Sequence, residues 1–187
     1  MDYKKAASYW MEKDEKAVRM ERDALLIQIE KFIMAHNTCS LATGYGDFVR
    51  CTPIEYNYKD RRFWLLSEGG LKFRGLEYNK NVCLAIYDNY SRFSQLEGMQ
   101  IFGTAELVEP WTGEYMNLLA FKNIPAENLK KMPTVLYLIK VTPTRVDFLY
   151  SEFEKLGFDS RQHLYLRNST VEWYDFPGLN CMVTGSA

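Results

Sequence analysis

Arg50 and Lys72 carry the two side chains in this sequence best suited to holding a phosphate. A phosphate monoester bears about −1.5 to −2 charges at neutral pH, so a buried one needs charge-assisted donors of defined geometry. Arginine offers a planar fork and lysine a point charge. Gly69 and Gly70 shortly precede the lysine, and glycines let backbone N–H groups approach an anion at a helix start. Taken alone, however, both residues are better interpreted as ordinary solvated charges.

The sequence shows no metal-ligating or nucleophilic constellation. Its cysteines lie far apart without paired spacing, and its histidines are two: Cys39, Cys51, Cys83 and Cys181, with His36 and His163. This spacing is not that of a zinc site or of a disulfide framework, so we expect no bound metal and reduced, buried cysteines. The two histidines are expected to be surface or capping residues without a catalytic role.

The composition favours one soluble domain. The 187 residues are 47% hydrophobic and 15% aromatic, which is enough for one sizeable core and short for two. A net charge of −1 provides no field to gather nucleic acid or an anionic membrane. The chain begins with a charged stretch and has no apolar run of membrane-spanning length. We therefore expect a cytoplasmic protein without nucleic-acid or membrane partners.

Hydrophobic periodicity predicts a helix followed by a β-meander. Apolar side chains recur at helical spacing within residues 12–35, which indicates a helix with one packed face. The period then changes, and a glycine-containing turn at residues 44–47 joins strands over residues 38–43 and 48–58 into a hairpin. A short strand over residues 63–67 extends the meander.

The second half of the chain predicts further strands and helices. Residues 71–78 fit one or two helical turns, and residues 82–87 return to a strand. Residues 99–108 indicate a long strand bent at Gly103. Aromatic and leucine side chains at helical spacing predict a second amphipathic helix over residues 110–121.

The last predicted strands close a barrel. Residues 135–141 and 145–150 indicate two strands separated by a proline turn at residues 142–144. Six or seven strands in this order favour a mainly-β barrel with flanking helices. We treat residues 1–187 as one predicted domain, with an N-terminal extension over residues 1–22. The tail over residues 151–187 is expected to dock on its own domain or on a partner subunit.

Over residues 25–150 the order of elements resembles the flavin-binding split-barrel family, the pyridoxamine 5'-phosphate oxidase-like proteins. The segments that carry the resemblance are residues 49–54, residues 63–70, Lys72 with Leu76 and Asn79, and residues 100–106. No segment is diagnostic alone, but their order and spacing together are specific. The resemblance implies a six- to seven-stranded antiparallel split β-barrel with flanking helices. It also implies a homodimer with flavin mononucleotide (FMN) at its interface.

The resemblance further implies roles for individual residues. It puts Arg50 and Lys72 on the FMN phosphate, which reverses their interpretation as solvated charges. It implies that Cys51, Thr52 and Pro53 run alongside the flavin ring. The remaining cofactor contacts that it implies are Leu66 and Ser67 at the ring or ribityl chain, Gln100 at the ring edge, and Arg161 reaching the partner's flavin. Glu68 is expected to point outward, since a carboxylate beside a phosphate is repelled.

One departure separates the sequence from the true pyridoxamine phosphate oxidases. Those enzymes carry a tryptophan after the last barrel strand, where this chain has Leu149. The resemblance therefore favours a different FMN-dependent oxidoreductase, which takes electrons from a reduced nicotinamide or another small-molecule substrate. One alternative is a non-catalytic flavin- or haem-binding protein of the same fold. Another is a structural β-barrel in which Arg50 and Lys72 are ordinary surface charges.

Overall fold

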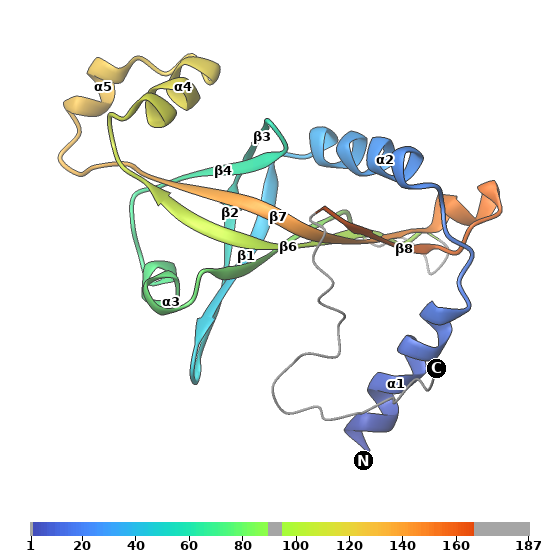
Figure 1. The fold of residues 1–187 in the computed structure, drawn as a ribbon. Helices are drawn as coiled ribbons and strands as arrows, with labels where there is room; N and C mark the ends of the chain where they lie inside the picture. Colours follow the sequence, from blue (N-terminus) through green and yellow to red (C-terminus); the bar gives the residue numbers. More distant parts are fainter. Residues whose placement is uncertain (1, 90–94, 167–187) are drawn as a thin grey trace, which may run out of the picture.

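The structure, a computed structural model, describes residues 2–89 and 95–166 (Figure 1). Its helices are α1 (Tyr3–Glu15), α2 (Arg22–Ala35), α3 (Lys72–Tyr78), α4 (Gly113–Phe121), α5 (Ala126–Lys130) and a 3-10 helix over Ser151–Leu156. Its strands are β1 (Thr38–Tyr45), β2 (Phe48–Glu55), β3 (Asn57–Lys59), β4 (Arg62–Ser67), β5 (Asn81–Tyr87), β6 (Glu97–Val108), β7 (Tyr137–Tyr150) and β8 (Arg161–Tyr165).

The strands form one antiparallel sheet in the order β2-β1-β5-β6-β7-β4-β3, with β8 paired to the second half of β7. The end strands β2 and β3 are consecutive in the chain but are not paired with each other in this order. The curled sheet is therefore a barrel that stays open along the free edge of β2. This arrangement confirms the predicted mainly-β split barrel with flanking helices.

Strands β6 and β7 are long because a bulge lets them bend together. The register shifts between Phe102 and Gly103, which leaves Thr144 as the extra residue beside Pro143. A Cβ on Gly103 would lie 2.5 Å from the Thr142 carbonyl oxygen, so the close approach requires glycine. The predicted bend at Gly103 is confirmed. The predicted break at residues 142–144 is wrong, because the proline sits at the bulge of one continuous strand.

The main core fills the inner face of the sheet, on which Leu41, Leu84 and Ile101 are fully buried. Helix α2 lies across this core and buries one stripe that includes Leu25 and Ile29. The predicted helix over residues 12–35 is not continuous, because α1 ends at Glu15 and α2 begins at Arg22. Helix α1 has no buried residue. The opposite side of the sheet, on which Ala42, Cys51 and Gln100 lie, is called the outer face.

A second, smaller core lies at one end of β6 and β7, where α4 and α5 are gathered (Figure 1). Trp64 of β4 and Leu138 of β7 pack there against Tyr115 and Leu118 of α4. This confirms the predicted helix over residues 110–121, which begins at Gly113. Helix α5 and strand β8 were not predicted.

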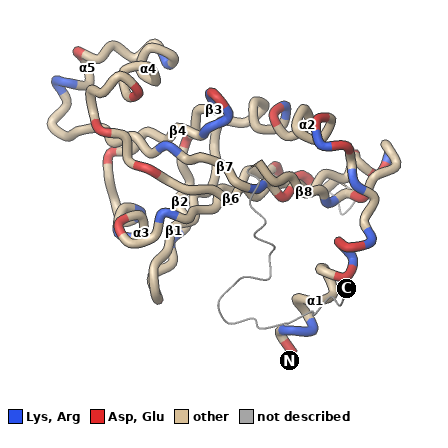
Figure 2. Tube along the Cα trace, viewed as in Figure 1, with Lys and Arg blue, Asp and Glu red and all other residues tan. Residues whose placement is uncertain are grey.

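Basic and acidic positions alternate over the fold without a large region of one sign (Figure 2). Among the described residues Cys39, Cys51 and Cys83 are unpaired, and Cys51 is exposed rather than buried as predicted. Cys181 and the part of the predicted tail from residue 167 to residue 187 lie outside the described residues. No helix in the described ranges is long and apolar enough to cross a membrane.

Candidate anion-binding site

Arg50 and Lys72 are brought together by the packing of α3 on the β1–β2 hairpin. Arg50 lies on β2 directly opposite Thr43 of β1. Gly75, one helical turn after Lys72, lies so near that a Cβ would be 3.0 Å from the Gly44 nitrogen and 3.1 Å from the Thr43 Cβ. The Asn79 side chain donates to the Gly44 carbonyl oxygen over 3.0 Å and fixes the other end of α3. We call Arg50 and Lys72 the basic pair.

The basic pair places two like charges together without a counter-charge. Burial first, and then the charge of Arg50, lower the pKa of Lys72 below its ordinary value. Lys72 is 7% exposed, and its ammonium donates to the Gly69 carbonyl oxygen. No carboxylate of the described residues lies within ion-pair distance of either side chain. Such a pair is unfavourable alone and favourable around an anion.

Buried polar atoms without partners gather beside the basic pair. Within the described ranges they include the Arg50 Nε and the hydroxyls of Thr43 and Thr52. Arg50 and Thr52 alternate along β2, and Thr43 faces Arg50, so all three side chains share the inner face. A buried donor without an acceptor costs about 1–3 kcal/mol. A phosphate, which has several acceptor oxygens, fits these donors.

The loop before α3 holds Lys72 in place through Ser67 and two glycines. Gly69 and Gly70 have φ angles of 125° and 102°, which L side chains rarely adopt. The Ser67 hydroxyl lies 3.1 Å from the Gly69 nitrogen and 3.2 Å from the Gly69 oxygen. The Gly69 amide therefore donates to Ser67. The sequence had suggested instead that this amide would be presented to an anion. Glu68 between them is exposed, as expected.

The other predicted site residues lie on two different faces. Cys51 and Pro53 are exposed on the outer face, because they alternate with Arg50 and Thr52 along β2. Gln100 is also exposed on this face. Leu66 packs instead against the second core, so its side chain is directed away from the basic pair. The structure thus gathers Arg50, Thr52, Ser67 and Lys72, but not Leu66.

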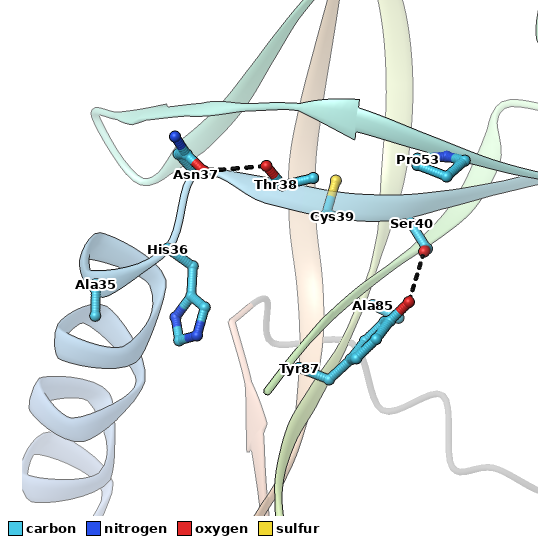
Figure 3. A pocket seen from close by; sticks show the side chains of 9 residues that line it. All are labelled: Ala35, His36, Asn37, Thr38, Cys39, Ser40, Pro53, Ala85 and Tyr87. Carbon is cyan, nitrogen blue, oxygen red and sulfur yellow. Dashed lines mark hydrogen bonds between the residues drawn. The ribbon is translucent and has the colours of Figure 1, made fainter. Parts of the chain in front are cut away.

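Two pockets adjoin on the outer face. A pocket of about 320 Å³ opens where β1, β2 and β5 meet the end of α2, with Pro53, Ala85 and Tyr87 in its wall (Figure 3). Ala85 and Tyr87 also line a second pocket, of about 180 Å³, which reaches Gln100 and Arg161. Of the predicted contacts, Pro53 thus lines the first pocket, and Gln100 and Arg161 line the second. Strand β2, which carries Arg50 on its inner face and Pro53 on its outer face, is an edge strand of the sheet.

His163 belongs to a polar network that sequence reasoning missed. Its Nδ1 lies 2.7 Å from Asp147 Oδ1, and its Nε2 lies 2.8 Å from Asp14 Oδ2 on α1. The Arg145 guanidinium pairs with the same Asp147 oxygen over 2.5 Å. Arg161, two residues before His163 on β8, has its guanidinium carbon 4.7 Å from the centroid of the Trp10 ring. His163 is 16 residues from Asp147 and 149 residues from Asp14, so no local pattern could indicate these contacts, which tie α1 to the sheet.

His36 confirms the expectation of a capping residue. Its Nδ1 lies 2.7 Å from the Phe32 carbonyl oxygen in the last turn of α2. Its Nε2 lies 3.2 Å from the Asp88 carboxylate.

Comparison with known proteins agrees with the fold and with the resemblance in the sequence. The profile of the family described as pyridoxamine 5'-phosphate oxidase matches residues 25–150. A search of curated proteins found no match.

Several solved structures share the fold at low sequence identity. HutZ, the haem storage protein from Vibrio cholerae, has a TM-score of 0.53 and 16% identity, with 66% of this chain and 91% of that chain covered. A FAD-binding protein from Mesorhizobium loti has a TM-score of 0.50 and 15% identity, with 65% and 89% covered. General Stress Protein 26 from Bacillus anthracis has a TM-score of 0.54 and 18% identity, with 76% and 98% covered.

The sheet order and the open edge at β2 define a split-barrel protein. Within that class, the chain belongs to the pyridoxamine 5'-phosphate oxidase-like family.

Proposed function

We propose that this chain binds FMN through the basic pair and acts as an oxidoreductase with a reduced nicotinamide or another small-molecule donor. The observation that carries the proposal is Lys72, a buried ammonium held beside Arg50 without a carboxylate. A terminal phosphate supplies the missing negative charge and accepts from the orphaned donors of Arg50, Thr43 and Thr52. A bound flavin supplies the hydride chemistry, and the protein supplies binding and orientation.

The two outer-face pockets suit the flavin ring in this proposal. Cys51 and Pro53 border the edge that a ligand must cross, and Gln100 offers an amide to a ring edge. The ring is mostly apolar with polar atoms at its rim, which matches pockets whose walls combine apolar side chains such as Pro53 and Ala85 with polar ones such as Gln100. Arg161 then lies near the ring, where its guanidinium contributes positive charge.

Flavin fits the described residues better than haem, although the comparable HutZ stores haem. Histidine is a common ligand of haem iron. Both ring nitrogens of His163 face carboxylates, and both of His36 face the Phe32 carbonyl and Asp88. A haem iron would have to displace these histidine contacts. A flavin phosphate instead meets the Arg50 Nε and the Thr43 and Thr52 hydroxyls, which have no hydrogen-bond partner within the described residues.

The visible spectrum of the purified protein tests the proposal. We expect visible absorption bands at wavelengths close to those of free FMN, either in the protein as purified or after FMN is added. Mass spectrometry should identify the released cofactor as FMN. The protein should then oxidise a reduced nicotinamide faster than free FMN does. A colourless protein that takes up no FMN would refute flavin binding, and a haem spectrum would favour the alternative. Bound FMN without turnover would leave a carrier rather than an enzyme.

We expect the FMN site to depend on the seating of α3 through Gly75. A Gly75→Val side chain has to occupy space that Thr43 and the Gly44 backbone already fill, so α3 moves and Lys72 separates from Arg50. FMN affinity should fall by about tenfold or more, with a loss of about 1–3 kcal/mol of stability. Isothermal titration and urea unfolding measure the two effects. Gly113→Val is the matched control, because nothing lies within 4 Å of a Cβ there.

We also propose that the outer face pairs with a second copy of the chain in a cytoplasmic homodimer. Val49 is 84% exposed and Tyr87 is 59% exposed on this face, and Ala42 lies between Cys51 and Cys83 at its centre. Exposed apolar and aromatic side chains over a sheet favour burial between subunits. The unpaired thiols are compatible with a reducing compartment.

An Ala42→Arg variant tests this interface. The new guanidinium would be buried without a partner in the dimer, so we expect a monomer by light scattering at concentrations where the unchanged protein is a dimer. Leu107→Arg, at the far end of β6, should leave the dimer intact. A dimer that tolerates Ala42→Arg would place the interface elsewhere.

A further inference from the structure

Helix α1 is linked to the second pocket through Trp10. Arg161 lines this pocket, and its guanidinium carbon lies 4.7 Å from the centroid of the Trp10 ring. A guanidinium over the face of a tryptophan is attracted by the negative charge of that face. Trp10 itself does not line the pocket. The place of a positive charge in the pocket wall therefore depends on a residue outside the pocket.

The described residues offer the Arg161 guanidinium no counter-charge. Its Nε is buried and has no hydrogen-bond partner among them. No carboxylate of residues 2–89 and 95–166 lies within ion-pair distance of this side chain. Asp147 lines the same pocket, but its carboxylate is paired with Arg145 over 2.5 Å. The Trp10 ring is thus the group that holds the guanidinium, and a partly buried cation of this kind favours negative charge beside it.

Two other contacts hold α1 and the segment after it against β8. Asp14 Oδ2 of α1 lies 2.8 Å from His163 Nε2. Arg19, in the segment that follows α1, donates from Nη1 to the Arg161 carbonyl oxygen over 2.8 Å. Neither contact involves the Trp10 ring. Truncating this ring should therefore release the Arg161 side chain while α1 stays in place.

We propose that Trp10 is a positioning residue, which holds the Arg161 guanidinium beside the flavin ring and so favours reduced over oxidised flavin. The inference rests on the proposed function, in which the ring occupies the outer-face pockets. The nicotinamide donor is oxidised as it gives the ring a hydride, which is two electrons and one proton. The ring therefore gains one negative charge, and the donor leaves with one positive charge more. A fixed positive charge beside the ring stabilises the charge that the ring has gained.

The midpoint potential of bound FMN in a Trp10→Ala variant tests this role. Without the ring the guanidinium is free to turn into solvent, so the preference for reduced over oxidised FMN should fall by about fivefold. For a two-electron couple this lowers the potential by about 20 mV, which equilibration with a reference dye measures. Arg161→Ala should lower the potential at least as much. Trp10→Phe keeps an aromatic face and should retain the potential of the unchanged protein.

Lys13 provides a matched control on the same helix. Its ammonium lies 5.1 Å from the centroid of the same Trp10 ring, but it is exposed and does not line the pocket. Lys13→Met therefore removes a positive charge from α1 without moving the Arg161 guanidinium. The potential of bound FMN should stay unchanged in this variant.

The outcomes separate this inference from the proposed function. Bound FMN whose potential does not respond to Trp10→Ala would overturn the positioning role alone, whatever Arg161→Ala does. A lower potential in Trp10→Ala together with faster tryptic cleavage at Lys16 and Arg19 would also overturn it, because the ring would then hold the helix rather than the guanidinium. A protein that binds no flavin would overturn the proposed function, and the inference with it.

Discussion

Replacing Arg50 by alanine and Lys72 by methionine together is expected to weaken FMN binding by about 10²- to 10⁴-fold and to leave riboflavin binding unchanged. A hydrogen bond to a charged group contributes about 1.5–3 kcal/mol, and each 1.4 kcal/mol is tenfold in affinity. Riboflavin lacks the phosphate, so it does not use the basic pair. Fluorescence titration of both ligands with both proteins measures the difference. Arg62→Ala, which removes an exposed charge from the start of β4, is the matched control.

The Lys72→Met change alone should stabilise the protein without ligand while it weakens FMN. Burial and Arg50 lower the pKa of Lys72, so the charged lysine costs stability at neutral pH. The gain should appear as a higher Tm of the variant at neutral pH. It should vanish as the pH rises above about 10.5, the ordinary value, where lysine is neutral in both states. Parallel unfolding of the two proteins across this range checks the sign. A less stable variant at pH 7 would mean that Lys72 has a structural role.

The parts of the fold that sequence predicts are those set by local pattern. The helical stripe through Leu25 and Ile29 and the bend at Gly103 are both visible in a short window, and both occur in the structure. Pro143 is the opposite case. A proline lacks the N–H that a sheet requires, which favours a turn, yet at a bulge the ladder does not need that donor. The bulge depends on a partner strand far along the chain, so no local pattern reveals it.

The candidate site divides in the same way. Arg50 and Lys72 are distinguishable from ordinary charges only through the spacing of a whole family, because their proximity depends on how α3 packs against Thr43. Side chains alternate along β2, so Cys51 lies on the face opposite Arg50. This alternation is visible in the sequence, and it explains why Cys51 is exposed rather than buried as predicted. The surroundings of His163 come from α1 and β7, elements whose bounds the sequence patterns did not predict.

The Asp147→Ala variant is expected to lose about 3 kcal/mol of stability, the largest effect of a single substitution outside the core. Asp147 accepts from Arg145 over 2.5 Å and faces His163 Nδ1 over 2.7 Å, and the three side chains are 11–12% exposed. Removing one partner from a buried ion pair leaves charges that were desolvated together, which costs about 3–5 kcal/mol. Arg145 keeps its contact with the Tyr165 hydroxyl, which places the value at the lower end. Urea unfolding followed by circular dichroism measures the loss.

Two comparisons decide whether the burial of the charges causes the loss of stability in Asp147→Ala. Asp147→Asn keeps the shape and one acceptor oxygen, so it should cost less than Asp147→Ala. Glu127→Ala removes the exposed ion pair with Lys130 and should cost less than about 1 kcal/mol, because solvent screens that pair. The loss in Asp147→Ala should also free α1, whose Asp14 meets the sheet through His163, and so speed tryptic cleavage at Lys16 and Arg19. Equal costs for Asp147→Ala and Glu127→Ala, with unchanged cleavage, would mean that the network does not hold α1 against the sheet.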